Sequence, residues 1–330
     1  MSDKFSRDVL KIDAEAESDR ICARIRELLA HTLHRRGIVI GLSGGIDSSV
    51  TAALAVRALG AKRVFGLLMP ERESSPDTLQ LSGEVARSFG IDTVLADITQ
   101  MLEAVGFYQS YQAAVRNVVP EFNSQWKSKL VSSGHDEWNG FTFFSVVAQS
   151  PSGEMVRVRL PHRTYLEIVA ATNFKQRIRK MIEYYHADRL HFAVAGTPNR
   201  LEYDQGFFVK NGDGSADIKP IAHLYKSQIY QLAEFLGVPE IVRKRPPTTD
   251  TYSLGQGQDE FYFSVPVEQL DICLYARNHG IAAEEVAQAT HLTTDAVQRV
   301  WQDIDRKRRT TRYLHLPPQL VSDVSEIEGL

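Results

Sequence analysis

The sequence predicts an α/β fold with a doubly wound parallel sheet, an inserted β-rich segment and a C-terminal helical extension. Three apolar runs of strand length, residues 38–42, 63–70 and 91–98, alternate with runs of helical periodicity. Strands and helices that alternate at this spacing are typical of parallel sheets, because each helix crosses over one face of the sheet.

The other elements follow in order along the chain. Residues 13–36 alternate charged and apolar positions at helical spacing, which predicts an amphipathic first helix. Residues 48–60 form a second predicted helix that ends at a glycine, and a third begins near Ser75. We expect a fourth strand within 189–197 and a further helix over 226–239.

Residues 106–165 interrupt this alternation of strands and helices. The stretch 141–160 has two β-rich runs around a Pro-Ser-Gly turn, which predicts a hairpin added to the main sheet. The aromatic residues of the segment form either a small extra core or part of a reshaped pocket. We therefore divide the chain into 1–275, a main domain that contains the insertion, and 276–330, a helical extension with a basic element.

Composition limits the kind of protein. With 330 residues, 43% hydrophobic and 24% charged, the chain is typical of a globular protein of one or two domains. Its apolar runs are too short to cross a bilayer, and residues 1–20 lack the apolar core of a signal peptide. Cys22 and Cys273 are too few for a disulfide framework. From these features we expect a cytoplasmic protein that does not bind membranes. The net charge of −3 gives no general drive toward nucleic acid, so we expect none as a partner.

Small residues occupy the turn between the first strand and the second helix, where residues 43–49 read SGGIDSS. Glycines let backbone N–H groups approach a phosphate, hydroxyls add donors, and the positive end of the helix faces the anion. Asp47 fits beside phosphates only with a cation, so we interpret it as a Mg²⁺ ligand. Taken alone, the loop is also compatible with a glycine-rich turn that binds nothing.

The loop lacks the Gly-Lys-Ser/Thr of Walker-type loops and the spacing of the GxGxxG fingerprint. It resembles the SGGxDS signature of the PP-loop ATP pyrophosphatases, which cut ATP between the α and β phosphates. That resemblance implies the Rossmann-like fold of the adenine nucleotide alpha hydrolases.

Further motifs resemble those of the NAD synthetases within this superfamily. Residues 195–239 match the family's GTxNxxE, its Gly-aromatic-x-x-Lys-x-Gly-Asp-Gly stretch and its Leu-x-Lys-x-Gln. Shorter matches follow the family's order: MPERESS at 69–75, NFKQRIR at 173–179, RPPTTD at 245–250, GQDE at 257–260 and DRKRR at 305–309.

The resemblance implies ATP-dependent amide synthesis. ATP adenylates the nicotinate carboxylate of deamido-NAD, pyrophosphate leaves, and ammonia attacks the acyl-adenylate to give NAD and AMP. It also implies a homodimer. Glutamine-dependent relatives carry a glutaminase domain for which this sequence has no room, so we expect free ammonia or a separate glutaminase partner.

Individual residues take roles from the same resemblance. Asp47 and Glu202 would hold Mg²⁺ and, with Lys226, form the catalytic group. The expected ATP contacts are Gly41, Ser43, Gly44, Gly45, Asp47, Ser48, Arg72, Arg177, Thr197, Lys226, Thr248 and Lys307, the last beside Arg306. The expected acid-substrate contacts are Asn173, Arg179, Lys210, Asp213, Asp217 and Glu260.

Several features leave alternatives open for the expected site residues. Asp213 lies in an NGDG turn and could merely bond its own backbone, and 306–309 could be a solvated helix end or a weak nucleic-acid patch. Gln176 stands where the family usually has Ala, Arg245 replaces a usual Lys, and GQDE is one residue short.

Two other functions are compatible with these motifs. One is a related ligase that adenylates a different carboxylate. The other is a non-catalytic nucleotide-binding protein, which the retained pair Asp47 and Glu202 disfavours. A tRNA-modifying enzyme is weaker still, because neither cysteine lies in a catalytic pattern and no RNA-binding module is evident.

Overall fold

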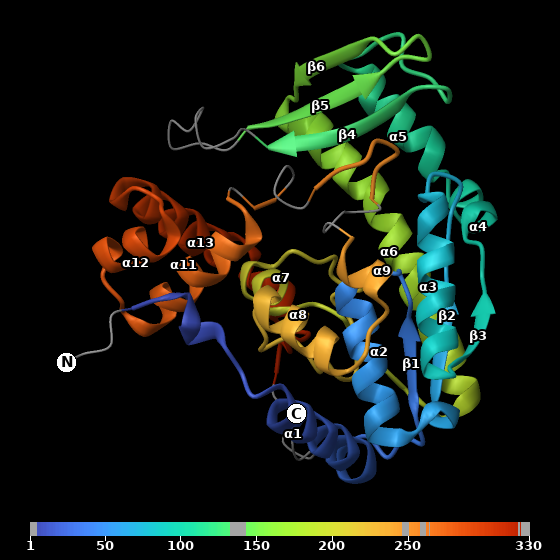
Figure 1. Cartoon of the computed structure of the whole chain (residues 1–330). Coiled ribbons are helices and arrows are strands. Elements are labelled where there is room, and N and C mark those ends of the chain that lie inside the picture. Colours follow the sequence, from blue (N-terminus) through green and yellow to red (C-terminus); the bar gives the residue numbers. More distant parts are fainter. Residues whose placement is uncertain are drawn as a thin grey trace.

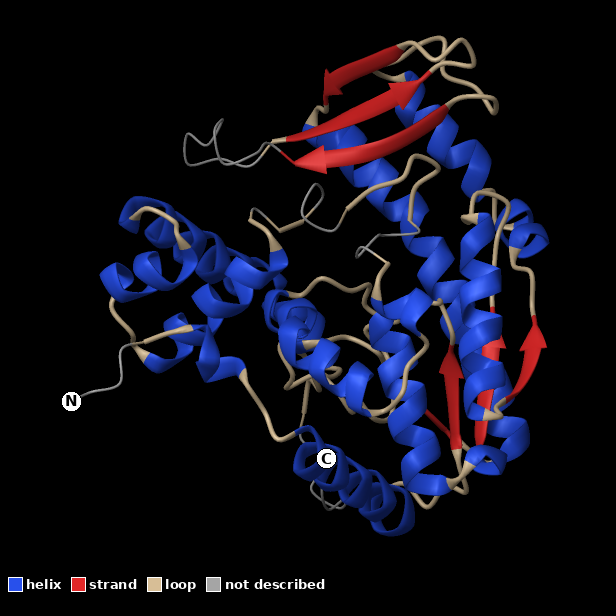
Figure 2. Ribbon diagram, in the orientation of Figure 1, coloured by secondary structure: helices blue, strands red, loops and turns tan. Residues whose placement is uncertain are grey.

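A four-stranded parallel sheet forms the centre of the computed structural model (Figure 1), with strand order β3-β2-β1-β7. Its strands are β1 (Ile38–Gly41), β2 (Val64–Leu68), β3 (Asp92–Leu95) and β7 (Ala193–Val194). Helices cover the sheet on both sides, as Figure 2 shows, so the doubly wound α/β fold is confirmed. The structure describes residues 5–132, 143–245, 251–257, 262–263, 265–322 and 324.

The predicted helices of the main domain occur in the expected order, together with helices that the sequence analysis did not assign. Asp13 begins the first of them, because its carboxylate accepts from the backbone N–H groups of Glu15 and Ala16. The sequence predicts a single helix over 13–36. The α-helix ends at residue 27, and a π-helical turn over Leu28–Thr32 follows it directly. The elements are η1 (Arg7–Leu10), α1 (Ala14–Glu27), η2 (Leu28–Thr32), α2 (Ile46–Leu59), η3 (Ala61–Arg63), α3 (Pro76–Phe89), α4 (Thr99–Ala104), α5 (Phe107–Arg116), α6 (His162–Leu190), α7 (Arg200–Gln205), α8 (Lys226–Phe235) and α9 (Glu240–Arg243).

Strand β1 divides the core into two layers. Successive side chains of a strand point to opposite faces of its sheet. Ile38 and Ile40 accordingly pack in a cluster with α1, α2 and α8, whereas Val39 packs in a second cluster with α4, α5 and α6. All three are fully buried. The end of β1, which carries the glycine-rich loop, is therefore held by packing on both sides.

The inserted segment forms a sheet of its own, and the expectation of a hairpin on the main sheet is wrong. The hairpin exists, as β5 (Phe144–Gln149) and β6 (Met155–Arg159), but it pairs with β4 (Lys127–Ser132) in a separate antiparallel sheet. Figure 1 shows this sheet beside the first half of α6, away from β1. Its buried residues, Leu130 among them, belong to the same cluster as Val39, so the expected separate small core is not formed.

In the C-terminal part that the structure describes, three helices follow one another: α11 (Val267–His279), α12 (Ala283–Thr290) and α13 (Thr294–His315). They share a hydrophobic cluster with Leu201 and Tyr225 of the main domain. The expected division at residue 275 falls inside α11 and stays a prediction. Within the described residues, no helix combines the length and apolar character that a membrane crossing requires.

Replacement of Leu130 should show that the inserted sheet shares the main core. Its side chain is fully buried, so Leu130→Ala should lower the free energy of unfolding by about 2–5 kcal/mol. Thermal melting followed by circular dichroism should give one transition at a lower temperature. Met155→Ala, at a side chain that is 53% exposed on the same sheet, is the control and should change little. An early, separate transition in Leu130→Ala would mean that the sheet unfolds independently.

Candidate active site

A cavity of about 460 Å³ lies where the carboxyl ends of β1, β2 and β7 face α6. Strand β2 pairs with one edge of β1, and β7, which comes much later in the chain, pairs with the opposite edge of β1. Open α/β sheets bind ligands in the crevice at such a reversal of strand order. The topology therefore places the cavity where a ligand is expected.

The glycine-rich loop forms the floor of this cavity. The hydroxyls of Ser43 and Ser48 lie 3.0 Å apart, and the Ser48 hydroxyl also donates to the Gly45 carbonyl at 3.0 Å. Gly44 has φ of +70°, and a Cβ added there would lie 2.7 Å from the Leu81 Cβ. A residue with a side chain would thus be strained at position 44 and would displace the loop. Helix α2 begins in the loop, so its N-terminal N–H groups and positive dipole end face the cavity.

Two carboxylates and one lysine meet beside the loop. The buried Lys226 ammonium forms an ion pair with Asp47, whose other oxygen accepts from the Asn199 amide at 3.1 Å. Burial and the nearby charge of Asp47, partly offset by Lys226, raise the pKa of Glu202 to about 8. The ammonium of Lys226 loses stability by burial, but Asp47 and Glu202 outweigh this and raise its pKa. When both carboxylates are ionised, their negative charge exceeds the positive charge of Lys226, so this part of the cavity suits a cation.

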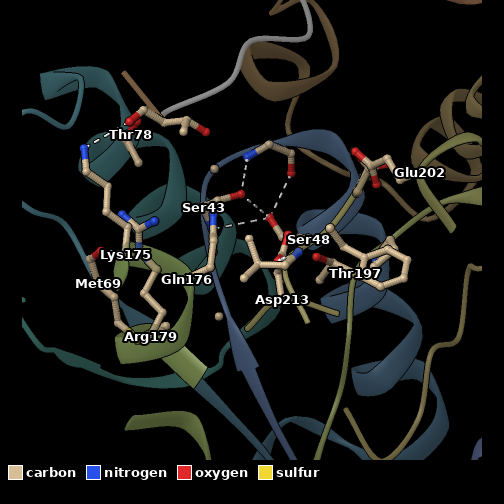
Figure 3. A pocket seen from close by; sticks show the side chains of 18 of the residues that line it. Ser43, Ser48, Met69, Thr78, Lys175, Gln176, Arg179, Thr197, Glu202 and Asp213 are labelled. Carbon is tan, nitrogen blue, oxygen red and sulfur yellow. Dashed lines mark hydrogen bonds between the residues drawn. The ribbon is translucent and has the colours of Figure 1, made fainter. Parts of the chain in front are cut away.

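Helix α6 forms one wall of the cavity, and Figure 3 shows Lys175, Gln176 and Arg179 of this helix beside the loop serines. Asn173 and Gln176 line the middle of the wall and offer amide groups. Arg179 donates to the Met69 carbonyl at 3.2 Å and also lines the cavity. The wall thus presents neutral hydrogen-bonding groups beside a positive one.

Acidic groups lie at the charged end of this wall. Lys180 forms a buried ion pair with Glu183 at 2.6 Å, and both residues line the cavity. Asp213 accepts from the Val209 N–H at 2.7 Å, so its carboxylate does close its own turn, yet it also lines the cavity. Burial raises the pKa of both Glu183 and Asp213.

The sequence analysis missed a buried network centred on Lys175. Its ammonium donates to Glu71 at 2.7 Å, to Glu73 at 3.0 Å and to the Thr251 carbonyl at 3.0 Å. The Tyr108 hydroxyl donates to the second oxygen of Glu71 at 2.9 Å. Burial alone would raise the pKa of Glu71, but the Lys175 charge holds it below its usual value. The network ties α6 to the loop after β2 and to the backbone at Thr251.

The cavity gathers most of the expected site residues. Those that line it are Gly41, Ser43, Gly44, Gly45, Asp47, Ser48, Asn173, Arg179, Thr197, Glu202, Asp213 and Lys226. Thr248 and Glu260 lie outside the described residues.

Five expected residues are not part of the cavity lining, and their substrate contacts stay predictions. The Arg72 guanidinium lies 3.6 Å from the centre of the Tyr108 ring and pairs with Glu103. Arg177 donates to the carbonyl of Lys210. The Lys210 ammonium in turn donates to the Tyr313 carbonyl at 2.8 Å.

The other two residues hold parts of the backbone. Asp217 accepts from the Val194 N–H at 2.7 Å and so fixes the end of β7. Lys307 donates to the Tyr262 carbonyl at 2.5 Å and pairs with Asp303 at 2.6 Å. Burial lowers the pKa of Lys307, although Asp303 opposes this effect. Arg306 also pairs with Asp303, one turn earlier in the same helix. The basic run is therefore partly engaged in contacts within this chain and is not fully solvated.

Comparison with known proteins agrees with this geometry. The sequence model of the NAD synthase family matches residues 17–128 and 152–312. A protein of Rhizobium meliloti (strain 1021) named NH(3)-dependent NAD(+) synthetase is 59% identical over 324 residues, which cover 98% of this chain and 97% of the relative. The part that the family model leaves unmatched inside the chain, 129–151, is shorter than the expected 106–165.

Two solved structures share the fold. An NH3-dependent NAD synthetase from Campylobacter jejuni has a TM-score of 0.61 and 22% identity, with 94% of this chain and 100% of that chain covered. An NMN synthetase from Francisella tularensis has a TM-score of 0.62 and 20% identity, with 94% and 99% covered. The family match extends over most of the chain and includes the glycine-rich loop, the two carboxylates and the α6 wall. The chain belongs to the NAD synthase family.

Proposed function

We propose that this chain uses ATP and ammonia to convert the nicotinate carboxylate of deamido-NAD into the amide of NAD, with release of AMP and pyrophosphate. The observation that carries the proposal is the cavity itself. It joins a phosphate loop, a pair of carboxylates and a long polar wall, in a chain that is 59% identical to an NH(3)-dependent NAD(+) synthetase. An identity of 59%, over an alignment that covers 98% of this chain, favours this acid substrate over a different carboxylate.

The chemistry requires activation before ammonia can react. A carboxylate is a poor electrophile, and its adenylation supplies AMP as a leaving group. The loop N–H groups and the hydroxyls of Ser43 and Ser48 bind the triphosphate, while Lys226 offsets negative charge beside it. Arg179 and the amides of Asn173 and Gln176 orient the acid along α6. Binding two anions with their reacting atoms in contact supplies much of the rate enhancement.

Asp47 and Glu202 fit a magnesium ion. Mg²⁺ uses oxygen ligands, commonly one or two carboxylates together with phosphates and water. Within the described residues, no group of three or more His, Cys, Asp or Glu forms a cage for a metal, so these two carboxylates would share the ion with ATP. When bound, the ion neutralises charge that develops on the phosphates. Burial and the charge of Asp47 raise the pKa of Glu202, so a cation beside the two carboxylates would stabilise the ionised form of Glu202.

The assembly and the source of nitrogen are also part of the proposal. Met181 and Tyr185 of α6 are 61% and 64% exposed, and this apolar surface suits the expected homodimer. Ammonia reaches the site as free ammonia or from a separate glutaminase. The expected cytoplasmic location stays a prediction.

The first experiment measures pyrophosphate release from Mg-ATP and ammonium, with and without deamido-NAD, while NAD is measured in parallel. NAD and pyrophosphate should form in equal amounts, because each adenylated carboxylate is converted to one amide. A folded protein whose ATP cleavage is not stimulated by deamido-NAD would contradict the proposed acid substrate.

Gly44→Ala should weaken ATP binding more than it weakens the fold. The added Cβ meets Leu81 and the backbone of α3, so the loop must move away from its position. Gly90→Ala is the matched control, because Gly90 has a similar φ of +65° with no atom nearer than 3.8 Å. Both variants should lose about 1–3 kcal/mol of stability from the backbone strain. Only Gly44→Ala should raise the Kd for ATP in calorimetric titration, and equal affinities would show that the loop does not bind ATP.

Asp47→Asn should lower turnover by about 10²–10³-fold, because the site loses a charge that stabilises the reacting phosphates through the cation. The substitution keeps the shape of the side chain, so the protein should still fold. Steady-state rates across a range of Mg²⁺ concentrations measure the effect. Asp19→Asn, at an exposed carboxylate paired with Arg57, controls for the loss of one negative charge. Near-normal pyrophosphate release by Asp47→Asn would exclude the metal role.

A further inference from the structure

The Lys175 ammonium, which no step of the proposed reaction uses, joins two separate walls of the cavity. It donates to Glu71 and Glu73 of the loop after β2 and to the Thr251 carbonyl, and its side chain is only 2% exposed. Thr251 itself lines the cavity, and so does Ser74 of the loop after β2. One buried charge thus connects two parts of the wall that are far apart in the chain.

The loop after β2 is shaped around Glu71. The Glu71 N–H donates to the Ser74 hydroxyl at 3.1 Å, and the Ser74 N–H donates back to the Glu71 carbonyl at 2.9 Å. The Glu71 carboxylate accepts from the Glu73 N–H at 3.0 Å and from the Tyr108 hydroxyl of α5 at 2.9 Å. The position of this carboxylate therefore fixes the turn that brings Ser74 to the cavity.

This loop adjoins the glycine-rich loop, at the end of the cavity where we place the triphosphate. The Leu42 N–H donates to the Leu67 carbonyl at 2.8 Å, which joins the ends of β1 and β2. A Cβ added at Gly41 would lie 3.2 Å from the Met69 Cε, so the two loops leave each other little room. A displacement of the loop after β2 would therefore change the space beside the glycine-rich loop.

A buried ion pair is a poor way to gain stability alone. Removing two charges from water commonly costs more than their attraction returns, and apolar side chains of similar size often serve the fold as well. The surroundings of Lys175 would suit such a side chain, because the almost fully buried Phe107 ring lies 4.9 Å from its ammonium. An apolar side chain would lack the ability to hold three oxygen atoms in fixed positions.

We propose that Lys175 is a positioning residue that holds the loop after β2 and the Thr251 backbone against α6, so that this end of the cavity is ordered before ATP binds. The inference rests on the proposed function. Walls that are already ordered cost less binding free energy than walls that the ligand must order. Without the ammonium, ATP should bind about 10-fold more weakly, because side chains of both walls would be immobilised only on binding.

The charge of Glu71 gives this role a signature in pH. The Lys175 ammonium holds the pKa of Glu71 below its usual value, against the effect of burial. The other groups that face this carboxylate are Glu73, which shares the ammonium, the Tyr108 hydroxyl, and Arg72, which covers the Tyr108 ring. Without Lys175, burial would raise the pKa of Glu71 above its usual 4.5. The ordered loop would then keep a proton that the displaced loop releases, so its stability should fall as the pH rises from 4.5 to the raised pKa.

The test compares the Kd for Mg-ATP, by calorimetric titration at about pH 5.5 and about pH 8.5, a range in which buried carboxyls titrate. The proteins are wild type, Lys175→Met, Lys175→Arg and the double variant Lys175→Met with Glu71→Gln. The ratio of each Kd to that of wild type at the same pH removes the titration of ATP itself and of Glu202, which all four proteins share.

Lys175→Met should bind ATP about 10-fold more weakly than wild type at the lower pH and about 100-fold more weakly at the higher pH, where Glu71 is ionised. The double variant has no carboxylate at position 71, so its affinity should be about 10-fold lower at both pH values. Lys175→Arg keeps the positive charge, and its ratio to wild type should not depend on pH.

Arg277→Met controls for the loss of one cation, because Arg277 pairs with Asp305 at 2.6 Å outside the cavity lining. It should bind ATP as wild type does, and a loss as large as in Lys175→Met would overturn the inference. Wild-type affinity in the double variant, or a pH dependence that survives in it, would overturn the inference as well.

The double variant also decides if Lys175→Met does not fold, because it leaves no ionised carboxylate beside the missing ammonium. Failure of the proposed function gives a different result. A wild-type protein that binds ATP but forms no NAD from deamido-NAD would contradict the proposed acid substrate, while the ratios of ATP affinity would still test the role of Lys175.

Discussion

The ion pair between Lys226 and Asp47 joins the two elements on which the site depends. Lys226 begins α8 and Asp47 lies in the first turn of α2, 179 residues earlier in the chain. The Lys226 side chain is almost fully buried, and an unpaired charge there would cost several kcal/mol. Asp271 of α11 accepts from the N–H groups of Lys226 and Ser227 at 3.2 and 2.7 Å, so it fixes the start of α8. The Lys226 ammonium is therefore positioned by three parts of the chain: α8 carries it, Asp47 of α2 pairs with it, and Asp271 of α11 fixes the start of α8.

This pair does not balance the charge of the site. Glu202 is buried beside Asp47 and Lys226, and its pKa is raised first by burial and then by the charge of Asp47, against the opposing charge of Lys226. A fold selected only for stability would replace such a group by an apolar one. The imbalance is understandable when a cation and a triphosphate complete the site, because the cation is attracted to the carboxylates and the phosphates to the cation. The same imbalance disfavours a protein that merely binds a nucleotide.

The sequence predicted what depends on neighbouring residues and failed where distant segments decide. The strand, loop and helix around Ser43 and Asp47 are contiguous, so their chemistry was readable and the cavity contains both residues. The hairpin at β5 and β6 was also readable, but its partner β4 was not, because strand pairing depends on tertiary burial. Lys175 was missed for the same reason. Its partner Glu71 lies 104 residues away, and nothing in the local pattern distinguishes a buried lysine from a solvated one.

The segment unmatched by the family model affects both stability and the shape of the cavity. Val146 and Ala148 of β5 pack in the core that contains Val39, so the register of this strand is set by core packing. A shift of one residue would exchange Phe143 for Phe144 at the cavity and expose the core face. Strand β4 of the same sheet also helps to position the part of the cavity wall around Tyr252. Its Ser128 carbonyl accepts from the Leu254 N–H at 3.1 Å, two residues after Tyr252, which also lines the cavity.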